Sequence, residues 1–116
     1  MSVVIYHNPR CSKSRQTLQL LKDNGVEPEI VEYLADTPSK DEIKKIIKSL
    51  GISARDILRK KEAIYKEAGF DNNSLSDDEI ITLMQKNPKV IERPIVVNGS
   101  KAAIGRPPEN VLKVID

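Results

Sequence analysis

The sequence lacks several features on which common protein functions depend. Cysteine occurs once, which excludes an internal disulfide, and no stretch is long and apolar enough to span a bilayer. The first ten residues lack the charged start and long apolar run of a signal peptide, so we expect a cytoplasmic protein without membrane contact. Tryptophan is absent and phenylalanine occurs once, so the core must rest on isoleucine, leucine and valine.

An excess of charge of one sign is also lacking. With 19 lysines and arginines against 17 aspartates and glutamates, the formal net charge is +2, too low for the broad basic surface of a nucleic-acid binder. Any basic site must therefore be local. The 116 residues suit one domain, 1–116, which would bury roughly two-thirds of the surface of its unfolded chain without a metal or a disulfide. We expect a monomer with no bound cofactor or metal.

The first part of the chain has the pattern of a β-α-β unit. Residues 3–6 are β-branched or aromatic and end at a turn-forming Asn-Pro pair, which predicts a buried strand. Apolar residues at helical spacing over 12–24 predict a helix that ends near Gly25. A second strand is expected from Pro28.

A helical segment follows, over about residues 39–87. Two capping-box pairs predict helix starts there, namely Ser39 with Glu42 and Ser76 with Glu79. The first of these helices is expected to end at Gly51. We also predict helix over residues 54–69, where apolar side chains recur among many charges.

The last part of the chain is predicted to be β-β-α. Two apolar runs, 93–97 and 101–104, flank the turn sequence "NGS", in which Asn98-Gly99 indicates a hairpin. Prolines then open a helical pattern after Gly105. The whole order fits an α/β domain with helices inserted after the second strand.

The one cysteine, Cys11, falls where the first strand gives way to the first helix. The amide end of a helix favours an anion, and neighbouring cations favour the thiolate form of a cysteine. Arg10 and Arg15 are close in sequence. This position therefore predicts a nucleophilic thiolate, although a cysteine packed under the helix stays an alternative.

Two neighbours of Cys11 are candidates for supporting roles. His7 would, as a cation, add a charge or a hydrogen bond to the sulfur, or would simply be a surface or hydrogen-bonded loop histidine. Ser14 lies where dithiol oxidoreductases of similar fold place a second cysteine, so an outside thiol must clear any intermediate on Cys11. Alternatively, Ser14 only caps or packs within the first helical turn.

Three arginines are candidates for binding an oxyanion, because guanidinium groups offer a planar fork of donors and stay charged. They are Arg59, Arg93 and Arg106. The predicted hairpin would bring Arg93 and Arg106 to the same end of the sheet, whereas each arginine taken alone is a surface residue by default. Pro94, at the entrance of a predicted strand, is a candidate for a cis peptide bond.

Four stretches, "YHNPRCSKSR", "DILRKKE", "RPIVV" and "GRPPENVL", resemble the glutaredoxin-linked arsenate reductase family in their order and separations. The resemblance runs from Val3 to about Val114, nearly the whole chain. It implies a thioredoxin-like α/β fold, β-α-β / β-β-α, with a helical insertion after the second strand.

The resemblance also implies a mechanism and roles for residues. The cysteine matching Cys11 attacks the arsenic of arsenate, water leaves, and glutathione attacks the adduct before glutaredoxin completes the reduction to arsenite. The arginines that bind and polarise the oxyanion match Arg59, Arg93 and Arg106. His7 matches the histidine that favours the thiolate.

Three further positions match the family pattern. Ser14 and Arg15 complete its C-x-x-S-R start, in which the serine helps to position the active-site loop. Pro94 matches the proline that is cis in thioredoxin-like folds.

Three other functions stay open on the sequence. A glutathione-dependent thiol reductase with another substrate would use the same cysteine. Relatives of this fold that bind RNA polymerase and regulate transcription typically carry C-x-x-C, whereas this chain has C-x-x-S. Finally, the domain would be catalytically idle if Cys11 were packed away and the arginines were only surface residues.

Overall fold

The computed structural model describes residues 3–115, and the chain divides into two compact units. The first unit comprises Met1–Asp36 and Arg93–Asp116, and the second comprises Thr37–Glu92. The helical segment expected at about 39–87 falls within the second unit. That the whole chain acts as a single domain stays a prediction. No helix among residues 3–115 is long and apolar enough to cross a membrane.

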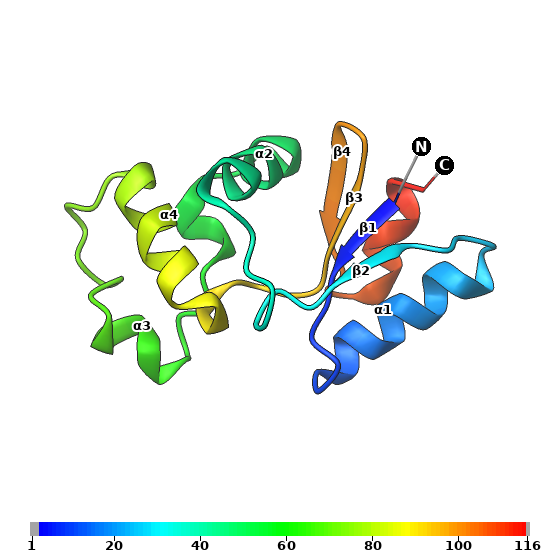
Figure 1. Cartoon of the computed structure of the whole chain (residues 1–116), viewed down its shortest axis with the longest axis horizontal. Helices are drawn as coiled ribbons and strands as arrows, with labels where there is room; N and C mark the ends of the chain where they lie inside the picture. The colour runs from blue at the N-terminus through cyan, green and yellow to red at the C-terminus, as the bar shows by residue number, and fades with distance from the viewer. Residues whose placement is uncertain (1–2, 116) are drawn as a thin grey trace. The chain divides into compact units, whose positions relative to one another are not determined.

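The first unit is built on a four-stranded sheet with the order β2-β1-β3-β4 (Figure 1). The strands are β1 (Val3–Tyr6), β2 (Glu29–Val31), β3 (Ile95–Asn98) and β4 (Lys101–Ile104). β1 pairs in parallel with β2 and antiparallel with β3, and β3 and β4 form an antiparallel hairpin. The parallel pair requires a crossover, which helix α1 (Ser12–Asp23) provides. This mixed sheet with helices confirms the predicted α/β class and the four predicted strands.

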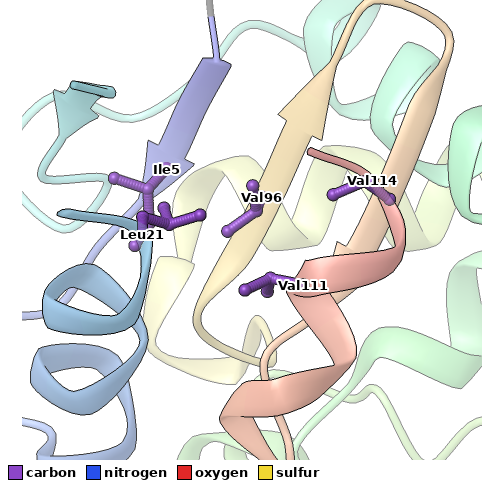
Figure 2. Close-up of a cluster of buried hydrophobic side chains, with 5 residues drawn as sticks. All are labelled: Ile5, Leu21, Val96, Val111 and Val114. Carbon is purple, nitrogen blue, oxygen red and sulfur yellow. The ribbon is translucent and has the colours of Figure 1, made fainter. Parts of the chain in front are cut away.

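Aliphatic side chains form the core between the sheet, α1 and the C-terminal helix η3 (Pro108–Lys113). Figure 2 shows five buried residues of this cluster, Ile5, Leu21, Val96, Val111 and Val114. No aromatic ring belongs to this cluster, as the composition suggests. The last helix is of the 3-10 type rather than a regular α-helix. Its two opening prolines, Pro107 and Pro108, have no N–H to donate.

The predicted hairpin is confirmed, but its turn lies one residue further along the chain. Asn98 pairs with Lys101, so Gly99 and Ser100 form the two-residue connection. Gly99 has a φ of 63°, a conformation that suits glycine. Asn98 belongs to the strand instead, and its Nδ2 donates to the carbonyl oxygen of Val114 at 2.7 Å.

The second unit is helical. It contains α2 (Lys40–Leu50), η1 (Ala54–Ile57), α3 (Ala63–Glu67), α4 (Asp77–Lys86) and η2 (Pro88–Val90). Within this unit α2, η1 and η2 contact α4. Ser39 Oγ accepts from the N–H of Glu42 at 3.2 Å, and Gly51 ends α2 in the left-handed conformation, as predicted.

The single helix predicted over 54–69 is wrong, because the segment breaks into η1 and α3. Between them the main chain bonds elsewhere: Glu92 N–H donates to the Ile57 carbonyl at 2.7 Å, and Arg59 N–H donates to the Val90 carbonyl at 2.6 Å. Leu58 is extended and forms a bridge with Ile91. These long-range hydrogen bonds occupy main-chain N–H and carbonyl groups that would otherwise pair with each other in a continuous helix.

Candidate active site

The loop between β1 and α1 holds Cys11 at the N-cap of the helix. Cys11 is a free thiol and is partly exposed. Its N–H donates to the Asn8 carbonyl at 3.0 Å, and the N–H of Arg10 donates to Asn8 Oδ1 at 3.0 Å, so Asn8 closes the turn twice. The first turn of α1 carries no acidic residue that would offset the positive end of the helix dipole. Cys11 thus stands at the anion-favouring end of α1, as predicted.

Ser14 ties this loop to the first turn of α1. Its side chain is fully buried, its Oγ lies 2.6 Å from His7 Nδ1, and it accepts the Asn8 N–H at 3.0 Å. One hydroxyl therefore fixes two consecutive loop residues against the helix. This geometry fits the loop-positioning part that the resemblance implies for Ser14.

His7 is 6% exposed and sits at the end of β1, where its N–H donates to the Val31 carbonyl at 2.8 Å. Burial lowers the pKa of His7 below its usual value of 6.5; Glu32 opposes this shift and Arg15 adds to it. A lowered pKa favours the neutral ring at pH 7. The structure therefore shows His7 as a buried ring paired with Ser14, and a direct action on the sulfur stays a prediction.

Arg106 reaches Cys11 from the other end of the unit's sequence. Its Nη2 lies 3.9 Å from Cys11 Sγ, and its Nε donates to the Arg93 carbonyl at 3.0 Å. The expectation that Arg93 and Arg106 lie at one end of the sheet is therefore confirmed. The Nε and Nη1 atoms of the Arg93 side chain are buried.

The peptide bond between Arg93 and Pro94 is cis, as the resemblance implies. The Arg106–Pro107 bond is cis as well, which was not predicted from the sequence. Arg15 is exposed and donates from Nη1 to the Pro9 carbonyl at 2.9 Å, so it braces the loop from outside.

Arg59 belongs to the second unit, where two carboxylates surround its guanidinium. Nη1 forms an ion pair with Glu62, and Nε lies 3.9 Å from Glu92 Oε1. Its main-chain N–H is held by Val90. The Arg59 side chain is therefore fixed and half-buried within its own unit.

The residues gathered in the first unit can support a nucleophilic thiolate beside a fixed cation. Among residues 3–115, histidine, cysteine and carboxylate side chains do not gather in threes as metal ligands would. Two residues at the site were not predicted from the sequence: Asn8, which accepts the N–H groups of Cys11 and Arg10, and Gly105, whose N–H donates to the Pro94 carbonyl. The Asn-Pro pair was a turn signal for Asn8, whereas nothing local marks Gly105.

Comparison with known proteins identifies relatives of this chain. The model of the ArsC family matches residues 6–114. An arsenate reductase of Haemophilus influenzae is 49% identical over 116 residues, covering 99% of this chain and all of that one. YfgD, an uncharacterised protein of Escherichia coli (strain K12), is 54% identical over 114 residues, covering 97% and 96%. A solved structure of an arsenate reductase from Vibrio cholerae superposes with a TM-score of 0.95 at 49% identity, covering 99% and 98%. This likeness confirms the predicted thioredoxin-like fold.

Proposed function

The chain belongs to the ArsC family, and we propose that it reduces arsenate to arsenite with Cys11 as the nucleophile and glutathione and glutaredoxin as the reductants. The observation that carries this proposal is the 3.9 Å approach of Arg106 Nη2 to Cys11 Sγ at the N-cap of α1. A cation and a helix end on one sulfur favour the thiolate.

In the proposed reaction the bond between the Cys11 sulfur and arsenic forms first and is broken last. The Cys11 thiolate attacks the arsenic of arsenate and one oxygen leaves as water. Glutathione then attacks the arsenic of the adduct and a second oxygen leaves as water. A glutaredoxin thiolate attacks the glutathione sulfur, so that a sulfur–sulfur bond forms while arsenic keeps the electron pair of the broken glutathione–arsenic bond, and water then releases arsenite from Cys11. Overall, two thiols become one disulfide while arsenic gains two electrons, so the chain needs no second cysteine of its own.

Positive groups are needed because an anionic sulfur attacks an oxyanion. We propose that Arg59, Arg93 and Arg106 bind the oxygens of arsenate and stabilise the charge of the crowded intermediate. Their guanidinium groups keep their charge at any physiological pH. We further propose that the protein acts as a monomer in the cytoplasm, where the glutathione pool is reducing.

A coupled assay tests the proposal. Purified protein with glutathione, glutaredoxin and glutathione reductase should oxidise NADPH only when arsenate is added, and Cys11→Ser should abolish this rate. An absence of arsenate-dependent turnover in the wild type would contradict the proposal. A Cys11–glutathione adduct that glutaredoxin reduces without any arsenate turnover would instead favour a thiol reductase with another substrate.

A further inference from the structure

We propose that Gly105 is a positioning residue of the active site: because it has no side chain, the main chain passes close to Thr17 and Pro94, and this sets Arg106 against the sulfur of Cys11. The proposal rests on the proposed function of Cys11 and Arg106. It concerns neither substrate contact nor chemistry at Gly105 itself.

The space around Gly105 is filled by two side chains that cannot easily give way. A Cβ at this position would lie 2.5 Å from Thr17 Oγ1, 3.0 Å from Thr17 Cγ2 and 2.8 Å from Pro94 Cγ. Thr17 is fully buried in α1, and its hydroxyl donates to the Lys13 carbonyl at 2.8 Å. Pro94 is buried and its ring is rigid. Any larger residue at 105 must therefore move its own main chain.

Hydrogen bonds around residues 105 and 106, one between main-chain groups and two from side chains to main-chain carbonyls, transmit such a movement to Arg106. The N–H of Gly105 donates to the Pro94 carbonyl at 2.9 Å, and Arg106 Nε donates to the Arg93 carbonyl at 3.0 Å. The segments 93–94 and 105–106 are thus held to each other by two bonds. On the other side, Asn110 Nδ2 donates to the Arg106 carbonyl at 3.0 Å. A shift at residue 105 therefore cannot leave the direction of Arg106 unchanged.

The guanidinium has little room for error at the sulfur. Its Nη2 is 3.9 Å from Cys11 Sγ, near the outer limit of a hydrogen bond to sulfur. Misplacement of a catalytic group by about 1 Å can cost about 100-fold in rate. We therefore expect Gly105→Ala to lower kcat/KM for arsenate by about 10-fold to 100-fold.

The variants test both the clash and its target. Gly105→Ala should slow turnover with arsenate and, in the absence of arsenate, slow the alkylation of Cys11 by iodoacetamide at about pH 6, where a cation beside the sulfur matters most. Thr17→Ala removes two of the three atoms that the new Cβ would meet, so Gly105→Ala with Thr17→Ala should recover part of both rates. The matched control, Thr17→Val, loses the same hydroxyl but keeps the volume of the side chain. Gly105→Ala with Thr17→Val should therefore recover neither the turnover rate nor the alkylation rate.

A cycle with Arg106→Gln shows whether the effect passes through Arg106. We expect Gly105→Ala to add little once Arg106 is Gln, because the group that it misplaces is gone. Full, independent losses in the double variant would overturn the proposal, as would wild-type rates in a folded Gly105→Ala protein. Unfolding of Gly105→Ala both alone and with Thr17→Ala would overturn it too, because the clash would then act on the fold. Alkylation is measured without arsenate, so a failure of the arsenate assay alone leaves this test intact.

Discussion

At the scale of single residues, the hydroxyl of Ser14 holds the active-site loop through two contacts, to His7 Nδ1 and to the Asn8 N–H. Ser14→Ala would leave His7 Nδ1 and the Asn8 N–H without this partner in a site where Ser14 is fully buried. We expect the free energy of unfolding to fall by about 1–3 kcal/mol and arsenate turnover to slow. Urea unfolding and the coupled assay check both effects.

Ser12→Ala is the matched control, because Ser12 opens the same helix but is exposed. Its unfolding free energy should change by no more than about 0.5 kcal/mol. Equal effects of the two substitutions would show that Ser14 has no special part in the loop.

His7 should make stability depend on pH. Burial lowers its pKa in the folded protein, so between that pKa and the unfolded value of 6.5 the unfolded chain binds more protons. Stability is then highest above about pH 6.5 and falls as the pH drops through the folded pKa. Urea midpoints measured from about pH 7.5 down to about pH 5.5 should fall in the wild type and much less in His7→Asn. Parallel curves would contradict the role of His7, which is the one histidine of the chain.

The sequence predicts single residues of the site unevenly. The place of Cys11 follows from a local strand–turn–helix pattern, and the meeting of Arg93 with Arg106 follows from the hairpin. The packing of Gly105 on Thr17 brings together residues that are far apart along the chain. A local pattern cannot show which side chain faces a glycine across the fold.

At the scale of elements, the start of α4 shows how much one cap contributes. Ser76 Oγ accepts the N–H of Glu79 at 3.2 Å, and Glu79 Oε1 accepts the N–H of Ser76 at 3.0 Å. Ser76→Ala should lower the unfolding free energy by about 1 kcal/mol, because an N–H of the first turn loses its acceptor. Thermal or urea unfolding measures this loss, and Ser74→Ala, an exposed serine outside the helix, should change it by less than about 0.5 kcal/mol. An unchanged midpoint for Ser76→Ala would refute the capping role.

Element boundaries were predicted where their causes are local. Capping pairs and the left-handed Gly51 fix the starts of α2 and α4 and the end of α2 within a few residues of sequence. The segment 54–69 failed because its main chain bonds to residues 90–92, which its own sequence does not contain. Likewise, the antiparallel pairing of β1 with β3 joins distant parts of the chain, so no local periodicity indicates it.

At the scale of the whole molecule, the positive groups of the proposed reaction are divided between the two units. Cys11, Arg93 and Arg106 belong to the first unit, and Arg59 belongs to the second. A net charge of +2 cannot by itself attract an oxyanion strongly, so a few fixed guanidinium groups must do so locally. The kinetics of an Arg59 variant therefore test whether the second unit contributes a positive group to the reaction.

Arg59→Gln should lower kcat/KM for arsenate by about 100-fold to 1000-fold if Arg59 stabilises the charge of the reacting oxyanion. Glu62 and Glu92 hold its guanidinium in place, so the charge is fixed before substrate arrives and little ordering is needed on binding. The matched control is Lys60→Gln, which removes the same charge from the exposed neighbouring residue and should leave kcat/KM within about twofold, because exposed charges are screened. If Lys60→Gln lost as much activity as Arg59→Gln, the effect would come from general charge. If Arg59→Gln kept full activity, Arg59 would be an ion-pairing residue of its own unit and nothing more.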